Sequence, residues 1–221
     1  MPLISIIMPT LNSENTVAKA MESLNIQDFL DFELIVVDGK SIDNTINIVE
    51  DFSANYKVRI HIENDKGIYD AMNKGITLSN GEWLYFLGSD DQLYNSNVIS
   101  NLSIHLIDSR FDIIYGNVYS DRFQGIYDNE FDAEKIIKKN ICHQAIFFKK
   151  TVFDEIGDFK VKYVSHADWE HNLRWFFTPK LKNKYVNLII ADYADGGFSS
   201  MQNDEKFRRV KKIKLIYYSF S

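Results

Sequence analysis

The sequence predicts an α/β fold in which helices cover both faces of a parallel sheet. Short apolar runs, each with the length of a buried strand, alternate four times with segments of helical period, and the connections between them are short. This alternation is typical of a parallel sheet with helical crossovers. A chain of 221 residues with 45% hydrophobic and 14% aromatic residues can bury a full core, so we expect one sizeable domain.

The N-terminal half carries the regular part of the pattern. The expected strands cover residues 4–8, 32–37, 58–62 and 83–87, and the expected helices cover residues 16–24, 45–52 and 68–78. The first strand is bounded by Pro9. The first helix follows from Val17, Ala20, Met21 and Leu24, which recur at helical spacing.

The C-terminal half is less regular. We expect helices over residues 97–107, 151–156 and 168–177, and strands over residues 111–119, 142–148 and 185–191. The second of these helices should end at Gly157, and the third has an acidic first turn, which the helix dipole favours. Residues 128–139 are polar and expected to be mostly loop, and residues 195–200 are expected to form a turn.

Acidic residues follow three of the four N-terminal strands, at Asp38, Asp65 and the pair Asp90–Asp91. The carboxyl ends of parallel strands share one edge of a sheet, where ligands bind, so these acids should converge. Taken alone, Asp90–Asp91 is as well explained by a solvated turn or a helix cap as by a divalent metal site, which prefers oxygen ligands. Three acidic strand ends on one edge favour a site.

Composition and charge exclude several classes of protein. Cys142 is the only cysteine, so disulfide frameworks and cysteine-based zinc sites within the chain are excluded. The N-terminus lacks the layout of a signal peptide, and no apolar run approaches the ~20 residues that span a bilayer, so we expect a cytoplasmic protein. The net charge of −6 and the lack of a recognition motif argue against a nucleic-acid partner.

The last segment, residues 206–221, differs from this acidic body. Basic residues there alternate with apolar ones at roughly helical spacing, which predicts a basic amphipathic tail. Two interpretations remain open. The tail is an ordinary packed terminal helix with a solvated face, or it lies on an anionic membrane surface at the inner face of the membrane.

Four stretches together resemble the family 2 glycosyltransferases. They are Ser5–Asn12, Ile35–Thr45, Asp65–Gly75 and Gly81–Asp91, in the order and spacing of that family. A looser likeness to bacterial polysaccharide and colanic-acid-type glycosyltransferases comes from His143–Gln144, Ala167–Glu170 and Gly196–Ser199. The resemblance implies a GT-A (Rossmann-like) fold with a mixed, mostly parallel sheet. It divides a single domain, residues 1–205, into a nucleotide-sugar-binding half (1–95) and an acceptor-side half (96–205).

The resemblance also implies a role for individual residues. The nucleotide would be bound by Thr10, Asn12, Asp38, Asp65, Lys66 and Asp90. Asp91 and Asp90 would hold Mg²⁺ or Mn²⁺ on the diphosphate, with Asp91 gripping the metal and Asp90 mainly the ribose. Asp168 matches the catalytic base, and His143, Trp169 and Glu170 are candidates for contact with the acceptor or the sugar. The family often has an acid two residues before Asp90, where this chain has Gly88.

Several of these residues have structural alternatives. Asp38 and Asp65 can be turn formers. Asp168 can be a helix cap, with Glu170 as the base. His143 can be a hydrogen-bonded structural residue, and Trp169 can pack in the core instead of stacking on a sugar.

The function that follows is an inverting, metal-dependent glycosyltransferase. Its donor would be a nucleotide-diphosphate sugar, with UDP the first choice, and its acceptor a hydroxyl of a glycan or lipid-linked glycan in bacterial surface polysaccharide synthesis. A divalent cation stabilises the charge that develops on the leaving phosphate, and a carboxylate takes the proton of the acceptor hydroxyl. The alternatives are a catalytically inactive nucleotide-sugar-binding module and a nucleotidyltransferase. The latter needs a Gly-rich, basic loop, which Pro9–Asn12 is not.

Overall fold

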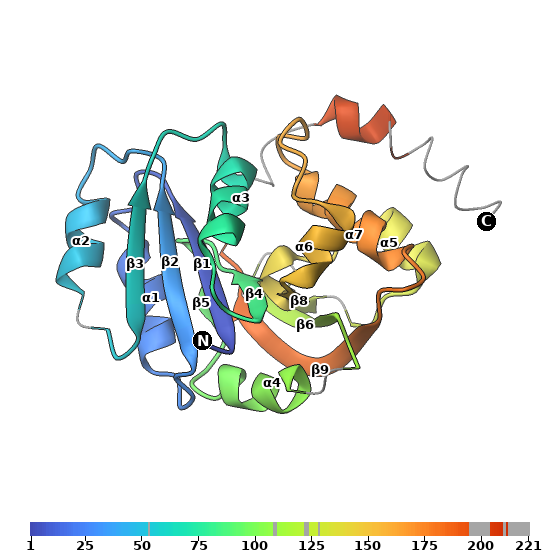
Figure 1. Cartoon of the computed structure of the whole chain (residues 1–221), viewed down its shortest axis with the longest axis horizontal. Coiled ribbons are helices and arrows are strands. Elements are labelled where there is room, and N and C mark those ends of the chain that lie inside the picture. Colours follow the sequence, from blue (N-terminus) through green and yellow to red (C-terminus); the bar gives the residue numbers. More distant parts are fainter. Residues whose placement is uncertain are drawn as a thin grey trace.

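A computed structural model describes residues 1–52, 54–107, 110–121, 124–127, 129–194, 204–209 and 211. Within these residues the chain forms a nine-stranded sheet in the order β3-β2-β1-β4-β8-β6-β9-β5, with β7 paired to β6 (Figure 1). The N-terminal half builds one side of this sheet and the C-terminal half the other, and the two halves meet where β4 pairs with β8.

The N-terminal half is a parallel sheet with helical crossovers, as predicted. Its strands are β1 (Ile4–Thr10), β2 (Phe32–Asp38), β3 (Lys57–Ile62) and β4 (Trp83–Phe86), and its helices are α1 (Val17–Asn25), α2 (Thr45–Asp51) and α3 (Ile68–Leu78). The pairs β1–β2, β2–β3 and β1–β4 are all parallel. β1 runs two residues further than expected, through Pro9, because its pairing with β4 ends at Ile7 and no β4 residue faces the proline.

The C-terminal half makes the sheet mixed, as the resemblance implied. Its longer elements are α4 (Val98–Leu106), β6 (Ile113–Ser120), β8 (Ile146–Lys149), α6 (Thr151–Ile156), α7 (Ala167–Phe176) and β9 (Asn183–Asp192). β8 is antiparallel to both β4 and β6, whereas β6 and β9 are parallel. The two short strands β5 (Gln92–Leu93) and β7 (Gly125–Tyr127) were not predicted.

Two predictions in this half are wrong. The segment expected to be mostly loop contains a helix, α5 (Ala133–Lys138), which is capped by Asp132 through a hydrogen bond from the Lys135 amide (2.7 Å) and anchored by the buried Ile136. The strand expected from residue 142 begins only at Ile146, because a 3₁₀ turn, η2 (His143–Ala145), precedes it.

Helices cover both faces of the sheet, which confirms the predicted architecture. On one face α1, α2 and α4 pack against a core that includes Met8, Val36 and Trp83. On the other face α3, α5, α6 and α7 pack against a core that includes Ile7 and Phe148. The central strands β1, β2 and β4, which separate the cores, are mostly apolar because both of their faces are buried.

The C-terminal tail falls largely outside the described residues, as does the turn expected over 195–200. Residues 205–209 are helical, and Phe207 is buried against Trp169 and His166 of the domain body. This part of the tail is therefore packed on the domain. No helix in the described part of the chain has both the length and the apolar composition to cross a bilayer.

Candidate active site

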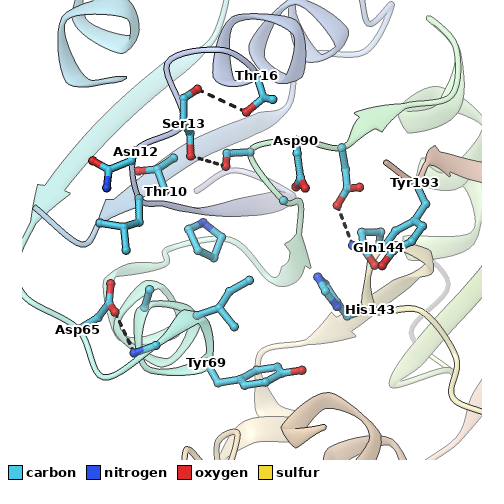
Figure 2. Close-up of a pocket in the computed structure, with 18 residues that line it drawn as sticks. Thr10, Asn12, Ser13, Thr16, Asp65, Tyr69, Asp90, His143, Gln144 and Tyr193 are labelled. Carbon is cyan, nitrogen blue, oxygen red and sulfur yellow. Dashed lines mark hydrogen bonds between the residues drawn. The ribbon is translucent and has the colours of Figure 1, made fainter. Parts of the chain in front are cut away.

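A cavity of about 430 Å³ opens at the carboxyl edge of the parallel strands (Figure 2). Its walls come from the loop after β1, the start of α3, the loop after β4 and the turn η2, so both halves of the chain contribute. Of the predicted site residues, those that line it are Thr10, Asn12, Asp65, Asp90, Asp91 and His143. Its volume is in the range of small-molecule sites.

Asp38 lies behind the cavity wall, where it joins two loops. Its carboxylate is fully buried and accepts hydrogen bonds from the Ser41 amide (2.7 Å), the Ser41 hydroxyl (2.6 Å) and the Thr10 hydroxyl (2.9 Å). Asn12 strengthens the same junction, since its amide donates to Ser41 Oγ and its Oδ1 accepts from the Ile42 amide. Asn12 has a φ of 51°, a left-handed conformation that asparagine tolerates better than most residues. The loops after β1 and β2 are thus locked together.

Asp65 reaches the cavity because residue 39 is glycine. A Cβ atom at Gly39 would lie 2.5 Å from Asp65 Oδ2, so any larger residue would displace this carboxylate. The other oxygen, Oδ1, accepts from the Gly67 amide at 2.9 Å. Lys66 does not line the cavity, and its amide donates to Asp70 Oδ2.

The carboxylates of Asp90 and Asp91 both lie close to Gly88. A Cβ atom at Gly88 would lie 2.5 Å from Asp91 Oδ2 and 2.8 Å from Asp90 Oδ1, so the two carboxylates converge on the space that a side chain there would fill. Asp90 is exposed to the cavity, whereas Asp91 is buried and accepts from Gln144 Nε2 (2.7 Å) and the Ala194 amide (2.9 Å). Burial, and then the charge of Asp90, raise the pKa of Asp91 to about 6.

This pair suits a divalent cation in part. Two carboxylate oxygens close to one point are ligands of the kind that Mg²⁺ and Mn²⁺ prefer. A neighbouring positive charge would also offset the burial and the Asp90 repulsion that together raise the pKa of Asp91. The described residues contain no group of three or more acidic, histidine or cysteine side chains placed to hold a metal. Further ligands would therefore have to come from a bound phosphate or from water.

Asp168 is buried in the first turn of α7, next to the cavity but not in its lining. One carboxylate oxygen accepts from the Tyr69 hydroxyl and the Trp169 amide, both at 2.8 Å, and the other accepts from Asn140 Nδ2 at 2.8 Å. His143 Nδ1 is 3.6 Å from this second oxygen. Burial alone would raise the pKa of Asp168, but the nearby His143, together with the hydrogen bonds from Tyr69 and the Trp169 amide, outweighs burial and lowers the pKa.

Trp169 and Glu170 follow Asp168 on α7 but do not line the cavity. Trp169 Nε1 donates to the Ile136 carbonyl of α5 at 2.8 Å, and its ring packs near Phe207. Glu170 is buried and accepts from Lys160 Nζ at 2.7 Å and from Arg174 Nε at 2.9 Å. Glu170 thus forms a buried ion-pair group that ties α7 to the preceding loop.

Several residues around the cavity were not assigned a role from the sequence. The most prominent are Tyr69, Gln144, Asn140, Ser13, Ser89 and Tyr193. Tyr69 and Gln144 lie within motifs that carried the family resemblance, so the sequence could have identified both as candidate site residues. Asn140 is remote in sequence from Asp168, and only the fold brings the two together.

Comparison with protein families and with curated proteins gives a consistent result. The model described as "Glycosyl transferase family 2" matches residues 5–161. A PGL/p-HBAD biosynthesis glycosyltransferase of Mycobacterium bovis is 38% identical over 211 residues, which is 93% of this chain and 82% of the relative. The glycosyltransferase GlyG of Streptococcus pneumoniae is 28% identical over 185 residues, and this chain covers 56% of its length.

Solved structures share the fold. Staphylococcus aureus TarS (residues 1–349), in complex with UDP-GlcNAc, matches with a TM-score of 0.74 and 21% identity over 92% of this chain. The mannosyltransferase PcManGT from Pyrobaculum calidifontis, in complex with GDP-Man and Mn²⁺, matches with a TM-score of 0.71 and 15% identity over 96% of this chain. The chain spans 62% and 61% of these two structures, respectively.

Proposed function

The chain belongs to glycosyl transferase family 2 and is a glycosyltransferase, and we propose that it moves a sugar from a UDP-sugar to a hydroxyl of a glycan or lipid-linked glycan. The observation that carries this proposal is the cavity at the carboxyl edge of the sheet. It brings the loop after β1, Asp65 and the Asp90–Asp91 pair around one space of suitable size. This arrangement can hold a nucleoside at one end and a diphosphate at the other.

The nucleoside end would lie between Asn12 and Asp65. Both residues line the cavity and can hydrogen-bond a base or ribose, while Thr10 and Asp38 fix the loops beneath. Lys66 is next to this end and would add a positive charge toward the phosphates. TarS is described with UDP-GlcNAc and PcManGT with GDP-Man, so a panel of donors must include both nucleotides.

Asp91 and Asp90 would hold Mg²⁺ or Mn²⁺ at the diphosphate end, with Asp90 also in reach of the ribose. When bound, such a cation acts as a Lewis acid on the leaving diphosphate. The Gln144 and Ala194 hydrogen bonds keep Asp91 in one orientation, and the small residue at position 88 leaves room for both carboxylates.

The acceptor hydroxyl must lose a proton as it attacks the anomeric carbon. Asp168 is the residue that we propose takes this proton, and its lowered pKa keeps its carboxylate ionised at neutral pH. No side chain of the enzyme is proposed to attack the anomeric carbon. The acceptor oxygen therefore displaces the diphosphate in one step and inverts the anomeric centre. Nuclear magnetic resonance of the product anomer tests this inversion.

The experiment that tests the function is a transfer and hydrolysis screen over UDP-, GDP- and dTDP-sugars with Mn²⁺ or Mg²⁺. We expect turnover with at least one donor, loss of turnover in Asp168→Asn with donor binding retained, and loss of metal-dependent activity in Asp91→Ala. Donor binding without turnover in the parent chain would instead support an inactive binding module. Unchanged transfer in both variants would refute the assignment of the site.

The acceptor is proposed to belong to bacterial surface glycan or glycolipid assembly on the cytoplasmic side of the membrane. The name of the mycobacterial relative, which refers to PGL/p-HBAD biosynthesis, supports this class of acceptor. The basic residues of the tail, among them Lys206, Arg208 and Arg209, suit an anionic membrane surface. Co-sedimentation with anionic and neutral liposomes, with and without residues 206–221, tests the membrane contact, and equal binding in all four cases would contradict it.

A further inference from the structure

The first turn of α7 carries Asp168 but begins without a side-chain cap. The N-cap residue, His166, makes no capping hydrogen bond, so the amides at the start of the helix lack the usual side-chain partner. One of these amides, that of Trp169, donates instead to Asp168 Oδ1 at 2.8 Å. A movement of this turn would therefore shift the Asp168 carboxylate and change one of its hydrogen bonds. The turn depends on support from elsewhere in the fold.

The short helix of the C-terminal tail packs on this turn (Figure 1). Phe207 is 2% exposed and stacks on the ring of His166, with 5.2 Å between the centroids and 8° between the planes. The centroid of the Phe207 ring also lies 5.3 Å from that of Trp169 and 5.9 Å from that of Tyr163. Since Asp168 lies between His166 and Trp169 in the chain, Phe207 contacts the residues on both sides of the proposed proton acceptor.

The tail helix is itself fixed in orientation. Asp204 caps it, because its Oδ1 accepts from the Phe207 amide at 2.9 Å and its carbonyl accepts from the Arg208 amide at 3.1 Å. Four residues after Phe207, Lys211 Nζ lies 3.4 Å from the centroid of the Trp169 ring, which is a cation–π contact. Phe207 and Lys211 thus share one face of the tail, and both contact Trp169.

The residues under the tail are linked to the carboxylate by hydrogen bonds. Trp169 is held by α5 as well as by the tail, since its Nε1 donates to the Ile136 carbonyl at 2.8 Å. The Tyr69 hydroxyl donates to Asp168 Oδ1 at 2.8 Å and lies 3.3 Å from the carbonyl of Ser165, the residue before the N-cap. Displacing this turn would therefore disturb the contacts of Asp168 with both Trp169 and Tyr69.

We propose that Phe207 is a positioning residue for the proton acceptor Asp168, an inference that rests on the proposed glycosyl transfer. The docked ring holds the first turn of α7, so that the carboxylate keeps its place beside the cavity. Lys206, Arg208 and Arg209 of the same helix are exposed. The apolar face of the tail helix therefore serves α7, and its largely basic face is left for an anionic surface.

The test uses Phe207→Ala in the full chain, with Glu205→Ala as the matched control. Glu205 is on the same short helix but is exposed, and its ion pair with Arg209 (3.7 Å) is on the surface. We expect Phe207→Ala to lower kcat for transfer by about ten- to a hundredfold, since a 1 Å misplacement has an effect of up to that order. The Kd for the donor should change less than about threefold, because no described tail residue lines the cavity. Glu205→Ala should match the parent chain.

Two further measurements separate positioning from a general loss of structure. Phe207→Leu keeps most of the buried apolar volume and should return kcat to within about threefold of the parent chain. Hydrogen exchange should become faster in the first turn of α7 in Phe207→Ala but not in Glu205→Ala, whereas the amides of the remote helix α4 should exchange at the parent rate in both variants.

The inference is overturned if Phe207→Ala keeps kcat within about threefold of the parent chain, or if kcat and donor binding are lost together. His166→Ala tests the same contact if Phe207→Ala does not fold, because His166 is only half-buried and its removal leaves the core intact. A kcat equal to that of the parent chain in this variant would also overturn the inference. Failure of the proposed function is distinct, since the parent chain would then transfer sugar from no nucleotide donor.

Discussion

Gly88 leaves room for the two carboxylates that follow it. The family resemblance leads one to expect an acid at this position, yet a Cβ atom there would lie 2.5 Å from Asp91 Oδ2 and 2.8 Å from Asp90 Oδ1. The space of the missing side chain is already filled by the two carboxylates that follow. A side chain at this position would have to displace the carboxylates of Asp90 and Asp91, although the backbone of Gly88 has no special conformation.

The steric role of Gly88 predicts the outcome of restoring the motif. Gly88→Asp and Gly88→Ala should both push the carboxylates apart by about 1 Å and lower metal-dependent transfer by roughly a hundredfold, since a 1 Å misplacement has that order of effect. Activity and apparent Mn²⁺ affinity in a metal titration provide the measurement. Higher activity in Gly88→Asp than in Gly88→Ala would show that the position accepts a third metal ligand.

A stability measurement can distinguish the structural role of Glu170 from the catalytic role proposed for Asp168. Its carboxylate is buried between Lys160 and Arg174, so Glu170→Ala leaves the charge of Arg174 without its partner. We expect a loss of about 3 kcal/mol in the free energy of unfolding, as for other broken buried ion pairs. The kcat per folded molecule should stay within about threefold of the parent chain. A large fall in kcat without loss of stability would make Glu170 the base.

Helix α7 carries the proposed proton acceptor and the structural ion pair at different positions. Asp168 faces the cavity side, Glu170 faces the Lys160 loop, and His171 faces the aromatic cluster of α6 and β8. One short helix therefore couples the site to the packing of the C-terminal half. A change in any of these residues must be tested for stability before it is interpreted as catalytic.

His171 should make the stability of the fold depend on pH. Burial, and then the charges of Arg174 and Lys160, hold its pKa well below the ordinary value of 6.5. Below pH 6.5 the unfolded chain binds a proton that the folded chain does not, so stability is full above that pH and falls as the pH decreases. The slope can reach about 1.4 kcal/mol per pH unit from this one group.

Chemical denaturation between pH 5 and 8 measures this slope in the parent chain and in His171→Phe. The phenylalanine variant should lose the part of the slope that lies below pH 6.5, because phenylalanine does not titrate. The remote variant His105→Ala serves as the control for removal of a histidine. An identical slope in the parent and His171→Phe would show that the pKa of His171 is the same in the folded and the unfolded chain.

The elements that the sequence predicted well are those whose burial is complete. β1 and β2 are buried at every position and consist mostly of apolar residues, and α3 matches its predicted bounds because its apolar face repeats over 11 residues. α5 was missed because it has six residues and Ile136 is its only buried one. β5 has two residues and depends on its pairing with β9, which local sequence does not encode.

The part of the candidate site that lies at strand ends could be predicted, whereas the part built from contacts distant in sequence could not. The acids at strand ends converge because parallel strands share an edge, so Asp65, Asp90 and Asp91 were brought together as expected. The contacts around Asp168 join residues that are 28 and 99 positions away, and no local pattern predicts them. The same holds for Asp38, whose carboxylate turned out to serve the loops instead of the cavity wall.

Over the full chain, the cavity lies between two halves that meet through β4 and β8. Ligand binding to such a cavity should slow the local opening of both walls at once. A ligand at a hundred times its Kd stabilises the folded state by about 2.7 kcal/mol, which corresponds to roughly a hundredfold slower exchange in amides that exchange only through opening of the site.

Hydrogen exchange in the presence of the UDP-sugar and Mn²⁺ should therefore protect the loop after β1 and the turn η2 together, although they lie 130 positions apart in sequence (Ser13 and His143). Asp91→Ala should reduce protection at both walls, because Asp91 is held by Gln144 of η2 and lies beside Asp90 at the diphosphate end. The amides of α4, which contributes no residue to the cavity lining, provide an internal reference. Protection of the N-terminal wall alone would mean that the donor does not reach the C-terminal half and that the acceptor side forms only in a ternary complex.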